Sequence, residues 1–135
     1  MSSTPVEVTR TGEHTFTATN SRGAEVAVGR DGAPGAFTPG ELLLAAVAAC
    51  SAVTSENLVI RRIGEDGELV ARADRTKNPD DDHKFAEIQV SLDADLDGVP
   101  DRDKLLDAVQ RAIENYCTVS RSVEESTPIT LTLPR

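Results

Sequence analysis

An apolar segment at residues 42–53 constrains the fold of this chain more than any other feature. It follows Thr38-Pro-Gly-Glu41, where Thr38 suits the N-cap, proline the first helical position and Glu41 the third, as in a capping box. The helix that begins there is predicted to end at Gly64, after two arginines in its last turn. Because its first half has no polar face, we expect protein to enclose it on every side.

In the segments on either side of this helix, apolar residues either alternate with polar ones, as in strands, or recur at helical spacing. Strands are predicted at residues 6–8, 15–19, 25–28, 68–74, 86–96 and 129–133, and two further helices at about 101–117 and 120–125. The charged residues 78–83 are expected to form an exposed loop between the two long strands. The order is βββ-α-ββ-α-α-β in a single domain of residues 1–135. It indicates an α+β fold in which sheet encloses the long helix.

Composition argues against several classes of partner. The formal net charge is −9, which repels phosphate backbones and anionic lipid, so neither nucleic acid nor a membrane is an expected partner. Tryptophan is absent and only four residues are aromatic, too few for a platform on which bases stack. The first residues are polar and resemble no signal peptide, and residues 42–53 are too few to span a bilayer. We therefore expect a cytoplasmic protein whose cysteines are reduced at rest.

The two cysteines are the best candidates for chemistry. Cys50 lies within the apolar helix and Cys117 at the junction of the two later helices. Apolar burial alone raises a thiol pKa, so a reactive Cys50 needs a nearby cation or hydrogen-bond donor. If Thr118 or Ser120 caps the last helix, Cys117 lies near a helix N-terminus, which favours the thiolate. The alternative is that both are small, inert core residues.

Metal and cofactor chemistry are not expected. His14 and His83 show no metal-ligand spacing with either cysteine. The acidic residues 80–82 suit a solvated loop, and the aspartates at 93, 95 and 97 suit the wet face of a strand. Phosphate-binding and dinucleotide-binding glycine motifs are absent from the sequence.

Two motifs carry a resemblance to a known family. Residues 38–50, Thr-Pro-Gly-Glu-Leu-Leu-Leu-Ala-Ala-Val-Ala-Ala-Cys, resemble the central-helix motif of the OsmC/Ohr family, and residues 116–121, Tyr-Cys-Thr-Val-Ser-Arg, resemble its second cysteine motif. The element order agrees, so the resemblance extends over essentially the whole chain. It implies an intertwined homodimer in which strands of both copies enclose each long helix.

The resemblance also implies a reaction. Cys50 would attack an organic hydroperoxide and become a sulfenic acid, which Cys117 would resolve as an intramolecular disulfide. An external dithiol, a lipoyl-protein or a thioredoxin-like protein, would reduce that disulfide. The expectation is therefore a thiol-dependent peroxidase of the oxidative stress response without a bound cofactor.

The sequence departs from the peroxidase branches of the family at the start of the helix. Gly40 stands where those branches carry glutamate, and Glu41 follows one place later, about 100° further around the helix. Arg22 is the best match for the family's thiolate-stabilising arginine, with Glu41 as its orienting partner, although Arg10 or Arg30 could substitute. The pattern is closer to the less-characterised OsmC-like branch. A non-catalytic dimer that binds a small hydrophobic ligand, a stress-associated redox sensor and a purely structural dimer are the alternatives.

Overall fold

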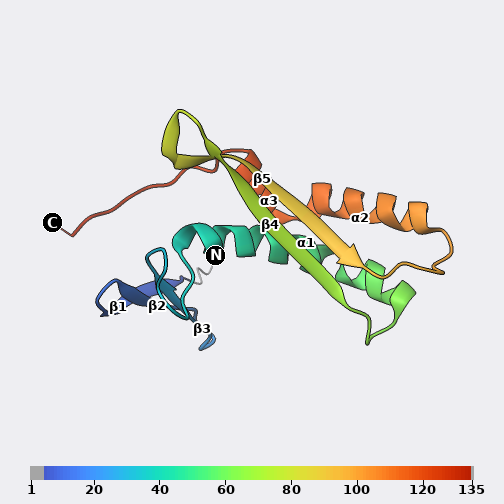
Figure 1. The fold of residues 1–135 in the computed structure, drawn as a ribbon, viewed down its shortest axis with the longest axis horizontal. Helices are drawn as coiled ribbons and strands as arrows, with labels where there is room; N and C mark the ends of the chain where they lie inside the picture. The colour runs from blue at the N-terminus through green and yellow to red at the C-terminus, as the bar shows by residue number, and fades with distance from the viewer. Residues whose placement is uncertain (1–4, 135) are drawn as a thin grey trace. The chain divides into compact units, whose positions relative to one another are not determined.

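The computed structural model describes residues 5–134 and divides the chain into two compact units between Leu44 and Ala45. The first unit contains the strands β1 (Glu7–Gly12), β2 (Thr15–Thr19) and β3 (Glu25–Gly29). The second contains β4 (Leu69–Asn78), β5 (Asp81–Ala94), α2 (Arg102–Tyr116) and α3 (Thr118–Glu124). The long helix α1 (Pro39–Ile63) begins in the first unit and continues into the second (Figure 1). The predicted order βββ-α-ββ-α-α is confirmed.

The first unit is an antiparallel meander in which β2 pairs with both β1 and β3. The turn between β2 and β3 is held by Asn20, whose Oδ1 accepts hydrogen bonds from the backbone N–H groups of Arg22 and Ala24, each at 3.0 Å. Gly23 completes the turn with a φ of 86°, a conformation that glycine adopts without a steric penalty. Residues 20–23 thus connect the strands predicted at residues 15–19 and 25–28, both of which are confirmed.

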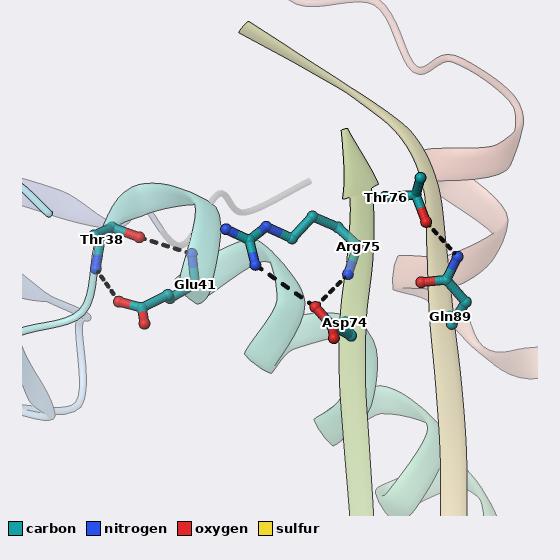
Figure 2. Close-up of polar contacts among 6 residues, drawn as sticks. All are labelled: Thr38, Glu41, Asp74, Arg75, Thr76 and Gln89. Carbon is teal, nitrogen blue, oxygen red and sulfur yellow. Dashed lines mark hydrogen bonds and ion pairs between the residues drawn. The ribbon is translucent and has the colours of Figure 1, made fainter. Parts of the chain in front are cut away.

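The start of α1 is the predicted capping box. Thr38 Oγ1 accepts a hydrogen bond from the Glu41 N–H at 3.1 Å, and Glu41 Oε1 accepts one from the Thr38 N–H at 2.8 Å (Figure 2). Two N–H groups that lack helical partners are thereby satisfied. The predicted end is confirmed as well, because Gly64 has a φ of 94° and donates to the carbonyl of Ile60 at 2.8 Å.

The two long strands form one antiparallel hairpin that is longer than predicted. Residues 78–83 were expected to be a loop, but β4 continues to Asn78 and β5 begins at Asp81, which pairs with it. A tight turn makes this possible, because Asn78 Oδ1 accepts a hydrogen bond from the Asp80 N–H at 2.9 Å. Backbone pairing thus continues through a charged, exposed segment. Further along, Gln89 Nε2 donates to Thr76 Oγ1 at 3.0 Å across the strands (Figure 2).

The core of the second unit lies where α1, α2 and the hairpin meet. Val59 of α1 and Leu105 and Val109 of α2 form a buried cluster with exposed fractions of 2–7%. Partly buried side chains surround it: Leu58, Ile63, Leu69, Leu92, Ala94, Leu96, Val99 and Ile113. The helix predicted at about residues 101–117 is therefore confirmed, and its packed side chains extend to Ile113. Tyr116, in the last turn of α2, is 75% exposed.

The last predicted strand is not formed in the single chain. Residues 127–134 have no regular secondary structure, and Ile129 and Leu131 of the alternating segment are 94% and 78% exposed (Figure 1, red terminal stretch). An alternating segment forms a strand only when a neighbouring strand satisfies its backbone. Within residues 5–134, the two sheets contain β1–β3 and β4–β5 alone.

The single chain leaves part of α1 uncovered, whereas the expected enclosure involves strands of both copies of a homodimer. Ala45, Ala49 and Val53 are exposed at four-residue intervals, and Val53 is 74% exposed. By length and composition alone, the whole helix of 25 residues could cross a membrane. Core helices of water-soluble proteins share that property, and Val59 places the second half of α1 in a core.

Adjacent leucines on α2 provide a matched test of this core. Leu105 is 2% exposed, whereas Leu106 is 44% exposed. We expect Leu105→Ala to lower the free energy of unfolding by about 2–5 kcal/mol, because it leaves a cavity in the cluster. Leu106→Ala should lower it by less than about 1 kcal/mol. Urea denaturation followed by circular dichroism measures both, and equal losses would contradict the assigned core.

Candidate functional site

Cys117 is held by the backbone on both sides. It is the C-cap residue of α2 and the N-cap residue of α3, so neither Thr118 nor Ser120 is the cap, and Cys117 itself stands at the N-terminus of α3. Its N–H donates to the Ile113 carbonyl at 3.0 Å, and its own carbonyl accepts from the Arg121 N–H at 3.0 Å. The side chain is completely buried. The position of the sulfur is therefore fixed by two helices at once.

The Cys117 sulfur has three side-chain neighbours that form hydrogen bonds with it. Ser120, one turn further along the chain, places Oγ at 3.2 Å from the Cys117 sulfur. The other two are Cys50 and Ser51, consecutive residues of α1. The structure thus brings together the two cysteines singled out in the sequence, 67 positions apart, as free thiols.

These contacts change the acidity of Cys117. Burial is the largest influence on the pKa of its thiol and raises it. The hydrogen bonds act in the opposite direction, first that from Cys50, then those from the hydroxyl and backbone of Ser120, then that from Ser51. Together they outweigh burial, so the pKa lies below its ordinary value of 9.0. The donor that a reactive thiol requires is therefore present at Cys117.

The buried face of α1 next to Cys50 is polar but fully hydrogen-bonded. Ser51 and Ser55 are 2% and 0% exposed. Ser55 Oγ donates to the Ser51 carbonyl at 2.8 Å and to the Ala52 carbonyl at 3.3 Å, so its own hydroxyl is already engaged. A hydrogen bond from the Ser51 side chain also lowers the pKa of Cys117. One helical turn thus carries a thiol and a hydroxyl that both reach the same sulfur.

Sequence reasoning missed Ser51 and did not recognise the contact that Ser120 makes. The available signals were weak: Ser51 is the first polar side chain after the apolar run that contains Cys50, and Ser120 follows Cys117 at the helical spacing of three. Neither spacing says which buried sulfur a hydroxyl will meet.

The other predicted site residues belong to the first unit, whereas both cysteines belong to the second. Arg22 is exposed in the β2–β3 turn, Arg10 lies in β1 and Arg30 follows β3. One carboxylate oxygen of Glu41 is engaged by the Thr38 N–H in the capping box. Their suggested role beside the thiolate therefore stays a prediction.

A groove of about 740 Å³ lies elsewhere in the second unit. Its lining includes Arg62, Arg72 and Asp93, and it lies over the strand ends rather than at the cysteines. Among residues 5–134, no group of three or more His, Cys, Asp or Glu side chains is arranged to hold a metal ion. The pair of thiols is thus the group of side chains best suited to a chemical reaction.

Comparison with known proteins identifies the family. The family model described as OsmC-like protein matches residues 30–132. An uncharacterized protein of Mycobacterium tuberculosis is 35% identical over 130 residues, which cover 95% of this chain and 94% of the relative. The chain therefore belongs to the OsmC-like family.

Solved structures agree on the fold. A hypothetical protein from Aquifex aeolicus VF5 has a TM-score of 0.72 at 26% identity and covers 94% of this chain and 91% of its own. The organic hydroperoxide resistance protein OhrB of Bacillus subtilis has a TM-score of 0.57 at 24% identity, with 92% of each chain covered. At that identity, the likeness to OhrB concerns the fold alone.

The lowered pKa of Cys117 predicts a pH dependence of stability. In the range between the folded pKa and 9.0, the unfolded chain binds more protons than the folded chain, so stability rises with pH. The contribution is complete above 9.0 and is lost as the pH falls through the folded pKa. Under reducing conditions, the unfolding free energy of the native protein minus that of Cys117→Ser should increase toward pH 9. A constant difference would contradict the stabilised thiolate.

Proposed function

We propose that this protein is a thiol-dependent peroxidase that reduces organic hydroperoxides. The observation that carries the proposal is the hydrogen bond between Cys50 and the buried Cys117, which makes two free thiols immediate neighbours. Family membership supports it, since structures with the same fold include proteins named as organic hydroperoxide resistance proteins. Cys50 is partly exposed and Cys117 is not, so a peroxide meets Cys50 first.

The reaction then follows in two steps within the protein. The Cys50 thiolate attacks the distal peroxide oxygen, the O–O bond breaks, and the alkoxide leaves as an alcohol after taking up a proton. The Cys117 thiolate attacks the Cys50 sulfenic acid, and hydroxide leaves as water. Stabilisation of that thiolate by Ser120 and Ser51 favours this second step. The products are one alcohol, one water and a Cys50–Cys117 disulfide.

The disulfide requires an external dithiol to return it to the reduced state. A lipoyl-protein or a thioredoxin-like protein supplies this chemistry. Arg22 is our candidate for the cation that stabilises the Cys50 thiolate, with Glu41 orienting its guanidinium. Arg10 and Arg30 are the other arginines of the first unit that could take this role.

We further propose that the working form is a homodimer. Among residues 5–134, the exposed apolar stripe of Ala45, Ala49 and Val53 has no cover, and the alternating segment at residues 129–133 pairs with no strand. A second copy of the chain would bury the apolar stripe and would offer a free sheet edge to the alternating segment. Both features then have one explanation.

Measurement of the mass in solution tests the dimer. Light scattering should give twice the chain mass of 14.4 kDa. Val53→Glu, which places a charge in the stripe, should shift the protein toward monomer, whereas Val53→Ala should remain dimeric. A monomeric native protein would contradict the assembly.

The peroxidase activity is tested by following tert-butyl hydroperoxide consumption with a dithiol present. Cys50→Ser should lose essentially all turnover, because no nucleophile remains. Cys117→Ser should accumulate a Cys50 sulfenic acid, trapped by dimedone, and should over-oxidise to sulfinic acid under excess peroxide. Equal peroxide consumption by the native protein and Cys50→Ser would overturn the proposal. Ligand retained in native mass spectra without consumption of peroxide would favour a binding protein instead.

A further inference from the structure

The two sulfurs of the cysteine pair lie in unequal surroundings. Cys117 is 0% exposed, whereas Cys50 is partly exposed. The Ser120 hydroxyl lies 3.2 Å from the Cys117 sulfur. A disulfide between these two residues would therefore have one accessible sulfur and one sulfur beside a hydroxyl.

We propose that Ser120 is a positioning residue that makes Cys117 the leaving sulfur when the Cys50–Cys117 disulfide is reduced, so that the incoming thiol attacks Cys50. The inference rests on the proposed function only in taking this disulfide as the oxidised state. It assigns a direction to the reduction and a role to a residue outside the cysteine pair.

The hydroxyl is suited to both states of the sulfur. With Cys117 protonated, the thiol donates its hydrogen bond to Ser120 Oγ. A hydroxyl group can both donate and accept hydrogen bonds. Ser120 can therefore rotate its hydroxyl and donate to the Cys117 sulfur as negative charge develops on that sulfur. Hydrogen bonds to a charged group are roughly twice as strong as neutral ones. The contact therefore strengthens as the disulfide opens.

The electrons balance in two exchange steps. The thiolate of a reducing dithiol attacks the Cys50 sulfur, the disulfide bond breaks, and its electron pair leaves on Cys117 as a thiolate. The second thiol of the reductant then attacks the sulfur of its own mixed disulfide, and Cys50 departs as a thiolate. The reductant ends as a disulfide, and two electrons have passed to the protein.

Both the accessibility of the two sulfurs and their quality as leaving groups favour attack at Cys50 and departure of Cys117. An incoming thiol must reach the sulfur that it attacks, and burial withholds Cys117 from solvent. The better leaving sulfur is the one with the lower thiol pKa, and the pKa of Cys117 lies below its ordinary value because of its hydrogen bonds, with burial opposing them. Ser51 supplies a second hydroxyl, so Ser120→Ala should weaken the effect without removing it.

The test uses the full chain oxidised with diamide, which forms disulfides without a peroxide. Opening of the disulfide by glutathione is stopped with acid, free thiols are blocked with N-ethylmaleimide, and peptides are mapped by mass spectrometry. In the native protein, glutathione should be found on Cys50 and maleimide on Cys117. The rate of opening by dithiothreitol should fall about three- to tenfold in Ser120→Ala.

Two variants provide the controls. Ser120→Thr keeps the hydroxyl and should open the disulfide at close to the native rate. A purely structural role of Ser120 would not require this recovery. Ser122→Ala removes a hydroxyl from the same short helix and should match the native rate, because Ser122 contributes its carbonyl oxygen, not its hydroxyl, to the bond with Thr127. Circular dichroism confirms that each variant is folded.

Three results would overturn the inference: glutathione mapped mainly to Cys117, a native rate of opening in Ser120→Ala, or no Cys50–Cys117 disulfide after diamide. The outcome is separable from that of the peroxidase proposal. A protein that consumes no peroxide, yet opens through Cys50 with Ser120 dependence, would refute the peroxidase and sustain the role of Ser120.

Discussion

The junction between α2 and α3 fixes the site on which the chemistry depends. Cys117 ends one helix and begins the next, so hydrogen bonds to Ile113 and from Arg121 hold its backbone from both directions. The cluster of Val59, Leu105 and Val109 joins α2 to α1. Cys50 and Ser51 reach the buried sulfur because this packing is specific. A thiol pair on loops would lack such rigid support.

The same helix that presents Cys50 is incompletely covered in a single copy. Its stripe of Ala45, Ala49 and Val53 is apolar surface exposed to solvent, and the backbone of residues 129–133 pairs with no strand among the described residues. In the proposed homodimer, one association event satisfies both and also changes the surroundings of Cys50. Assembly and chemistry would then be linked, because the wall that a second copy adds beside α1 would determine which peroxides reach the thiol.

Features set by neighbouring residues could be predicted from the sequence, and those set by distant packing could not. The capping box of Thr38 and Glu41 and the turn at Asn20 were predictable, because each is closed by groups within four residues. The extension of the hairpin through Asn78 was missed, since charge suggested a loop where backbone pairing continues.

The pairing of the two cysteines is a prediction of the family resemblance, whereas no sequence feature predicted the hydroxyl partners of Cys117. Ser51 and Ser120 meet Cys117 only through the way the helices pack and through the side-chain directions that result. The prediction of a final strand at residues 129–133 was not met for a related reason. Its alternation is typical of a strand, but among the described residues no strand pairs with it.

Disulfide mapping after a single equivalent of tert-butyl hydroperoxide tests the central claim most directly, namely that Cys50 and Cys117 act as one redox pair. Intact-protein mass spectrometry of the reduced protein should show a loss of about two mass units, and digestion should yield a linked peptide that contains both cysteines. Unchanged mass with both thiols free, or a disulfide formed only between copies of the chain, would contradict the account.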